Sequence, residues 1–180
     1  VNAFIMQACY AMVYGIGPMY ASYIGLSVFQ ITLFMAAFIL GGLISQTPFG
    51  LLSDRIDRRF VIAICAAGGT AIAVLLSQLG ASNAILIYIA VGLLGAFILP
   101  LYSLGMAHTN DYLEKDQMVG ATGAIIKIGG AGSIIGAPAV AALMQFGAIN
   151  FFFLLLASLT ALVCLYTLYR VTRRAKAEDQ

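Results

Sequence analysis

The amino-acid sequence predicts an all-α membrane protein, built as a bundle of six transmembrane helices. The first reason is composition, because 62% of the 180 residues are hydrophobic and only 9% are charged, whereas soluble domains have about 45–50% apolar and about 25% charged residues. The second is that apolar stretches of about 20 residues, long enough to cross a bilayer as a helix, recur along the chain. The net charge is only +2 and no basic face is present, so we expect lipid as a partner and no nucleic acid.

Six apolar stretches, separated by short turn-forming or charged segments, define the expected helices. We place them at 1–23, 29–52, 60–79, 84–109, 117–146 and 148–170, so that 1–170 form one transmembrane domain and 171–180 a basic tail. Val1 stands inside an apolar stretch without a basic segment or a cleavage site before it, so we expect a piece of a longer protein.

The first, third and sixth stretches differ in the residues that their faces carry. In the first, Gln7, Tyr10 and Tyr14 are spaced three and four apart and therefore share one helix face. The stretches 60–79 and 148–170 are apolar nearly all round, which predicts wide contact with lipid.

The fourth and fifth stretches combine helix-bending and polar residues. In the fourth, Pro100 precedes Tyr102 and Ser103, and the fifth is rich in glycine. The Gly132-x-x-x-Gly136 spacing predicts close packing against a neighbouring helix, because small side chains let two backbones approach.

The basic residues predict the orientation. Six crossings place the N-terminus, the loops at 53–59 and 110–116, and the tail on one side of the membrane. Eight of the nine basic residues fall in these segments and none in the opposite loops; the eight are Arg55, Arg58, Arg59, Lys115, Arg170, Arg173, Arg174 and Lys176. Because basic loops resist translocation, we expect this side, with both ends of the chain, to be cytoplasmic.

A weak internal repeat divides the six helices into three plus three. Pro18-Met-Tyr-Ala in the first stretch is echoed by Pro100-Leu-Tyr-Ser in the fourth, and Phe49-Gly50 at the end of the second by Phe146-Gly147 at the end of the fifth. Such echoes indicate an inverted pair of three-helix units, as found in several transporter folds.

The loop between the second and third helices carries the most specific motif, Gly50-Leu-Leu-Ser-Asp54-Arg55-Ile-Asp57-Arg58-Arg59. It resembles the loop signature of the major facilitator superfamily (MFS), Gly-x-x-x-Asp-Arg-x-Gly-Arg-Arg/Lys. The matching residues are Gly50, Asp54, Arg55, Arg58 and Arg59. Asp57 replaces the second glycine, and since Asp tolerates left-handed backbone better than most residues, we expect the turn to survive.

This resemblance implies a fold and a function. It implies an MFS-like half, here the C-terminal six helices of a twelve-helix bacterial inner-membrane protein, with the N-terminal half as partner. The implied function is secondary active transport of a small solute by alternating access, proton-coupled or by exchange. The run Pro100-Leu-Tyr-Ser-Leu, with Ala107-His108, Asn110 and Asp111, resembles one uncharacterised bacterial branch of the family.

The resemblance also implies a conformational latch in the loop motif. Asp54 would cap a helix of the partner half in one state and release it in the other, because helix N-termini stabilise carboxylates. Arg58 or Arg59 would pair with an acid at the end of the fourth helix, for which Asp111 is the candidate. The alternative is that these charges only solvate the membrane boundary.

Polar residues inside the spans are the candidates for a substrate cavity: Gln7, Tyr10, Tyr14, Tyr102, Ser103 and Lys127. Lys127 lies about ten residues, or about 15 Å, into the fifth helix. A cation at that depth needs a partner, and since this half has no acid within a span, an anionic substrate or an acid of the other half is expected. The alternatives are that Lys127 snorkels to the interface and that the tyrosines only hydrogen-bond neighbouring helices.

Two other classes of function stay open, a membrane-embedded enzyme and a non-transporting membrane protein with the same bundle. The sequence favours neither, since it has one histidine, His108, and no acid inside a span. The cysteines Cys9, Cys65 and Cys164 have no paired spacing, and we interpret them as packing residues. We therefore expect no catalytic residue, no metal and no cofactor.

Overall fold

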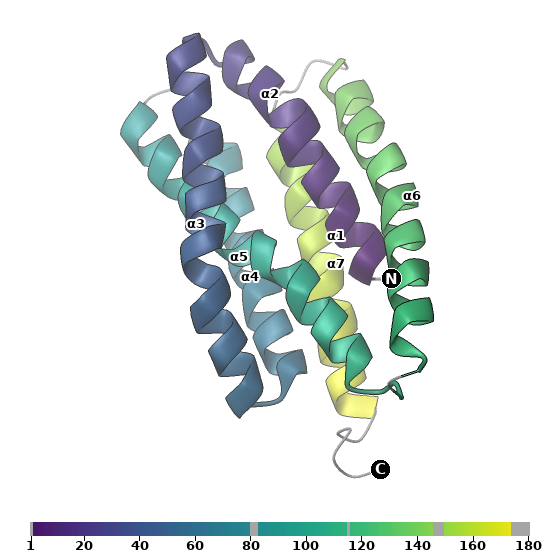
Figure 1. The fold of residues 1–180 in the computed structure, drawn as a ribbon. Helices are drawn as coiled ribbons and strands as arrows, with labels where there is room; N and C mark the ends of the chain where they lie inside the picture. Colours follow the sequence, from purple (N-terminus) through teal and green to yellow (C-terminus); the bar gives the residue numbers. More distant parts are fainter. Residues whose placement is uncertain (1, 80–82, 115, 146–149, 174–180) are drawn as a thin grey trace.

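The computed structural model describes residues 2–79, 83–114, 116–145 and 150–173, and these form a helical bundle (Figure 1). The helices of the first apolar stretch are α1 (Asn2–Ala11), the π-helix η1 (Met12–Ile16) and α2 (Gly17–Tyr23). The long helices are α3 (Val28–Arg55), α4 (Arg58–Leu79), α5 (Ala84–Asn110), α6 (Met118–Gln145) and α7 (Phe151–Arg173). In the described ranges these five are long and apolar enough to cross a membrane.

The first expected span is continuous helix, but its hydrogen-bond register changes inside it. The Gly17 N–H bonds to the carbonyl of Met12, five residues back, so η1 carries the wider π turn. Since each of the three pieces is shorter than a membrane-spanning helix, the count of six spans stays a prediction. The other five helices lie within three residues of the expected boundaries.

Helix ends follow local signals in the sequence. Ser27 forms a capping box with Gln30, in which each side chain accepts a hydrogen bond from the other residue's backbone N–H, at 3.4 and 2.9 Å. The Asn83 side chain accepts from the N–H of Ile85 at 3.0 Å and so starts α5. Between α2 and α3, Gly25 has a φ of +86°, which only glycine adopts at little cost.

Three helix pairs dominate the packing, α3 with α5, α4 with α7, and α1 with α6, while α4 also packs on α5. Figure 1 shows α3 at one side of the bundle, α6 at the other, and α7 behind α1. The α4–α7 pair is joined by a hydrogen bond of 2.9 Å between the hydroxyls of Thr70 and Thr160. The packing prediction for the cysteines is confirmed for Cys9 and Cys65, which are fully buried.

Glycines allow two of these pairs to approach closely. A Cβ at Gly95 on α5 would overlap the carbonyl of Phe38 on α3. On α6, a Cβ at Gly132 would overlap the carbonyl of Phe4, and one at Gly136 would lie 2.5 Å from that of Ala8. The prediction that Gly132 and Gly136 pack against a neighbouring helix is confirmed, and the neighbour is α1.

One end of the bundle gathers the charged loop motif. Figure 1 shows the α3–α4 turn, the end of α5, the start of α6 and the end of α7 together there. We call it the motif end. The connection between α3 and α4 consists of Ile56 and Asp57 alone, so the motif is held by two helices and cannot behave as a free loop.

Candidate functional site

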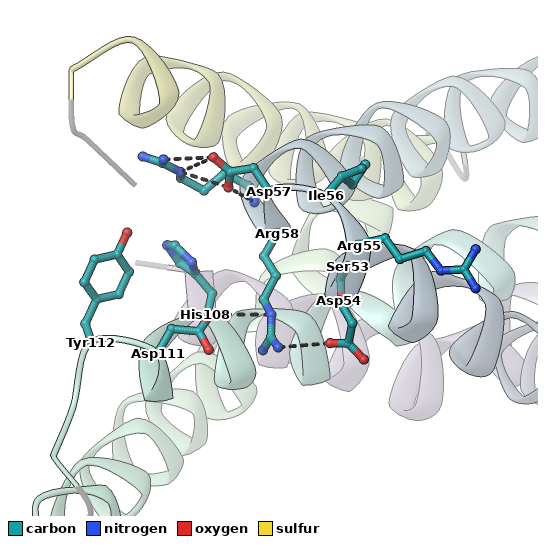
Figure 2. Close-up of a pocket in the computed structure, with 10 residues that line it drawn as sticks. Ser53, Asp54, Arg55, Ile56, Asp57, Arg58, His108, Asp111 and Tyr112 are labelled. Atoms are coloured by element: carbon teal, nitrogen blue, oxygen red, sulfur yellow. Dashed lines mark hydrogen bonds and ion pairs between the residues drawn. The ribbon is translucent and has the colours of Figure 1, made fainter. Parts of the chain in front are cut away.

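A charged cavity of about 470 Å³ lies at the motif end, between the α3–α4 turn and the end of α5 (Figure 2). It is lined by Ser53, Asp54, Arg55, Ile56, Asp57, Arg58, Arg59, His108, Asp111 and Tyr112. The acids and the arginines of this lining are interleaved along the chain, so the cavity can hold its charge as internal ion pairs.

Arg58 bridges two acids in this cavity. Its Nη2 lies 3.1 Å from Asp54 Oδ1 at the end of α3, and its Nε lies 3.4 Å from Asp111 Oδ2 after α5. The ion pair predicted between Asp111 and Arg58 or Arg59 is therefore confirmed, with Arg58 as the partner. The Asp54 and Asp111 side chains are 64% and 38% exposed, so each pair is worth about 0.2–1 kcal/mol. Contacts of that size hold a conformation without locking it.

Arg59 is held quite differently, by Asp57. Its Nε lies 3.1 Å from both Asp57 oxygens and its Nη2 lies 2.8 Å from Oδ2. The two side chains are only 5% and 11% exposed. Two-point pairing of a guanidinium with a carboxylate is strong and directional. The two adjacent arginines thus have separate acids.

Asp57 also starts α4. Its Oδ1 accepts the backbone N–H of Arg59 at 3.0 Å, and its carbonyl accepts that of Phe60 at 2.9 Å, as a helix N-cap does. The turn expected between the two helices is present, with α3 ending at Arg55 and α4 starting at Arg58. It forms without left-handed backbone at Asp57, since glycine alone has positive φ among the described residues. An aspartate that caps a helix needs ordinary extended backbone.

The remaining motif residues are less engaged. Gly50 accepts a hydrogen bond of 2.8 Å from the Ser53 hydroxyl through its carbonyl, and a Cβ there would meet no atom within 4 Å. Arg55 is exposed, and Figure 2 shows its side chain pointing away from Asp54 and Arg58. The structure thus gathers Asp54, Arg58 and Asp111 and leaves Arg55 outside the group.

A second cluster, of aromatic rings, joins α1, η1, α3 and α5 within the bundle. Tyr10 of α1 lies 6.3 Å from Tyr14 of η1 and 6.2 Å from Tyr102 of α5, measured between ring centroids. The Tyr14 ring also stands edge-on to Phe38 of α3 at 5.9 Å. Three of the candidate cavity residues therefore meet, and Tyr14, 44% exposed, is the one most open to a ligand.

A sequence model of the Major Facilitator Superfamily matches residues 1–180, the full extent of the chain. The chain belongs to the Major Facilitator Superfamily. It is 28% identical over 155 residues to the uncharacterized MFS-type transporter YcaD of Escherichia fergusonii, with 86% of this chain and 39% of that protein covered. The proteins of the same name from Escherichia coli strains HS and K12 / DH10B have the same identity and coverage. The chain thus spans about two fifths of the length of these curated relatives. Its family and its long apolar helices make it a membrane protein of a transporter family.

The other cavity candidates take no part in the ring contacts of the aromatic cluster. Gln7 faces α6, where its Cγ would lie 2.7 Å from a Cβ on Gly129, and the Ser103 hydroxyl bonds to the carbonyl of Pro100 in its own helix at 2.9 Å. Lys127 is exposed on α6, half a helical turn away from the side on which Gly136 contacts α1. In the described ranges it forms no ion pair.

Tyr10 forms a hydrogen bond to a neighbouring helix, the kind of contact that the alternative from the sequence expects. Its hydroxyl donates a hydrogen bond of 2.6 Å to the carbonyl of Leu99, directly before Pro100 in α5. The bond fixes α1 to α5 at the point where the proline interrupts the backbone bonding of that helix. Tyr10 therefore joins α1 to α5 by a hydrogen bond, while Tyr14 is the more exposed of the two tyrosines.

Sequence analysis missed three participants, Phe38, the π-helix η1 and the capping role of Asp57. A signal was available for Asp57, because an aspartate directly before a helix is a typical N-cap. For Phe38 there was none, since it is one of many apolar residues in α3. Among the described residues no group of His, Cys, Asp and Glu could hold a metal ion.

Proposed function

We propose that this chain is the C-terminal six-helix half of a secondary transporter in the bacterial inner membrane, moving a small solute by alternating access. The observation that carries the proposal is the bridge that Arg58 makes between Asp54 and Asp111, at 3.1 and 3.4 Å. It ties the α3–α4 turn to the end of α5 through contacts that are each weak enough to break. Two conformers separated by a few kcal/mol can be exchanged by such contacts.

In this mechanism the latch comprises Gly50, Asp54, Arg55, Arg58, Arg59 and Asp111. Within it, Asp54, Arg58 and Asp111 exchange partners, whereas Arg55 stays exposed to water. Asp54 is 64% exposed, so it can leave Arg58 and cap a helix N-terminus of the other half, which stabilises a carboxylate by about 0.3–1 kcal/mol. That gain is close to the worth of the ion pair it gives up, so the exchange is nearly balanced. Coupling is to protons or by exchange of solutes.

The arrangement of helices supports the three-plus-three repeat. The repeat matches the first span (α1 to α2) to α5, α3 to α6, and α4 to α7. Under this matching the α3–α5 pair corresponds to the α6–α1 pair, and the α4–α7 pair corresponds to itself. The two corresponding pairs also share close glycine contacts, through Gly95 and Gly132. Inverted repeats of this kind place the substrate near the midplane, where Tyr14, Tyr102 and Lys127 are our candidates for contact.

The charges support the orientation. Five described basic residues outside the spans' interiors gather at the motif end, namely Arg55, Arg58, Arg59, Arg170 and Arg173. We place this end, and both ends of the chain, in the cytoplasm, because basic segments stay on that side.

The experiment uses the full-length protein with its native cysteines replaced and Tyr14→Cys introduced. Alternating access predicts that a polar, membrane-impermeant thiol reagent reacts with this cysteine both in right-side-out and in inverted vesicles. Leu165→Cys is the control, because Leu165 is 64% exposed on a helix that we expect to face lipid, and it should react from neither side. A panel of radiolabelled organic anions, sugars and amphiphilic drugs then identifies what proteoliposomes take up.

The rival functions predict other results. A non-transporting protein or a membrane-embedded enzyme with this bundle would give labelling of position 14 from one side at most, and no solute of the panel would accumulate. That pair of results would overturn the proposal.

A further inference from the structure

Asp57 is the charged residue of the loop motif that the latch does not include. It stands where the family signature has glycine, and it makes the most buried ion pair of the described residues, with Arg59. A turn and a helix cap need no buried guanidinium. Closing the turn between α3 and α4 therefore does not account for the Asp57–Arg59 ion pair.

The role follows from the neighbour. Arg58 and Arg59 are consecutive, carry the same charge and line one cavity with Asp111. Asp111 pairs with Arg58 at 3.4 Å, with its carboxylate 38% exposed, so a second guanidinium on the same turn would compete for it. Asp57 prevents this, because it grips Arg59 at two points at the buried side of the turn.

We propose that Asp57 is a positioning residue that reserves Asp111 for Arg58 by holding Arg59. The Arg58–Asp111 contact is then one weak, exposed pair that opens in a single step. Without Asp57 the acid would have two alternative partners, and one could replace the other when the latch opens. The inference rests on the proposed function for its purpose, but the pairing itself can be measured without transport.

The decisive change is Asp57→Asn, since asparagine caps helices as well as aspartate does and removes only the charge. It is combined with Arg58→Gln and Asp111→Asn in the full-length protein. The thermal midpoint of unfolding in detergent is measured for each combination. In the parent, Asp111→Asn lowers the midpoint; in the Arg58→Gln protein it has no further effect, because Asp111 has no partner left to lose.

The parent and the Arg58→Gln protein are the reference proteins, and the prediction concerns a third one, which carries both Asp57→Asn and Arg58→Gln. In the Asp57→Asn/Arg58→Gln protein, Arg59 loses its two-point contact with the Asp57 carboxylate and pairs with Asp111. Asp111→Asn then again lowers the midpoint, by about 1–3 °C for a pair of this exposure. A purely structural role for Asp57 predicts that Asp111→Asn stays silent there, which would overturn the proposal. Adding Arg59→Gln should abolish the regained effect.

Two further measurements keep the test sharp. Asp57→Gly, which restores the family residue, should give the same pattern and covers the case in which Asp57→Asn does not fold. The rate at which Tyr14→Cys is labelled from the motif end should follow the same pattern, several-fold faster whenever Asp111 lacks a partner. If the midpoints behave as expected and position 14 is labelled from one side only, the positioning role stands and the transport function falls.

Discussion

Arg58 and Lys127 are two cations of one bundle that are held in opposite ways. Arg58 reaches two carboxylates of its own chain, at 3.1 and 3.4 Å, at the end of the bundle. Lys127 lies well inside α6, is exposed on this half and forms no ion pair in the described ranges. The charge of Arg58 is neutralised within this half, whereas we expect the charge of Lys127 to be neutralised by a group outside it.

The presence or absence of an ion pair within this half separates two roles for a cation. Arg58 influences the conformation of the bundle, whereas we expect Lys127 to bind a partner outside this half. A pair closed inside one half biases the choice between conformers by the small energy of an exposed ion pair, about 0.2–1 kcal/mol. A cation deep in the bilayer costs about 2.5–3.5 kcal/mol on insertion scales, and a position facing lipid would be cheaper to fill with Leu or Ile. We therefore expect the loss of Lys127 to affect transport far more than the loss of Arg58.

The largest effect is predicted for Lys127→Met, which keeps the length of the side chain and removes its charge. Uptake of the solute identified from the panel should fall at least about tenfold, the size of a lost interaction of about 1.4 kcal/mol, while the amount in the membrane stays unchanged. Lys127→Arg should be intermediate, because it keeps the charge and changes the shape. Uptake by the Met protein at the parental rate would show that Lys127 snorkels, and the comparison would fail.

A smaller effect is predicted for Arg58→Gln, which removes both ion pairs of the bridge. Loss of about 1 kcal/mol at exposed pairs should shift the balance of conformers about fivefold. The measurement is the labelling rate of Tyr14→Cys from the motif end, which should rise. An unchanged rate would mean that the bridge only solvates the boundary, as the alternative from the sequence has it.

A still smaller effect is predicted for Tyr10→Phe, which removes the hydrogen bond to the Leu99 carbonyl and leaves the ring contacts. Hydrogen bonds between transmembrane helices average about 0.6 kcal/mol, so the thermal midpoint should fall slightly and uptake should change no more than about threefold. Tyr14→Phe is the matched control for the midpoint, since no hydrogen bond of the described residues uses its hydroxyl. A loss of uptake as large as that of Lys127→Met would make Tyr10 a substrate contact.

The smallest effect is predicted for Arg55→Gln. Arg55 shares with Lys127 the lack of an ion pair among the described residues, but it is exposed at the motif end, where water solvates it. Uptake and labelling should therefore change less than about twofold, within the range of neutral surface changes. A strong effect would mean that Arg55 pairs with the other half, and that lack of a partner matters more than depth.

Much of the fold could be predicted, because the length and hydropathy of apolar stretches identify membrane helices in a sequence. The boundaries of α3 to α7 follow from that alone, and the Arg58–Asp111 pair follows from placing α4 and α5 as antiparallel neighbours. The choice between Arg58 and Arg59 could not be predicted. It depends on the direction in which each side chain leaves the first turn of α4, and Asp57 fixes that direction.

The pairing of helices distant in the sequence was also beyond reach. Glycines such as Gly95 and Gly132 indicate that another helix backbone approaches closely, but they do not identify which helix it is. The aromatic cluster has the same limit. The spacing of Tyr10 and Tyr14 predicts that they share a helix face, whereas the ring contact of Tyr14 with Phe38 depends on how α3 lies.

The π-helix has a consequence for comparing this chain with its relatives. A turn with i to i+5 bonding holds one residue more than an α-helical turn, so every side chain after Ile16 is rotated by about 100° relative to an unbroken α-helix. With that rotation, the Tyr20 ring lies 5.2 Å from that of Phe152 and 4.8 Å from that of Phe153, both on α7. In a relative that is one residue shorter between positions 12 and 16, a regular α-helix would place the residue equivalent to Tyr20 against the same side of α7. An alignment without a gap there would therefore pair residues that face different neighbours.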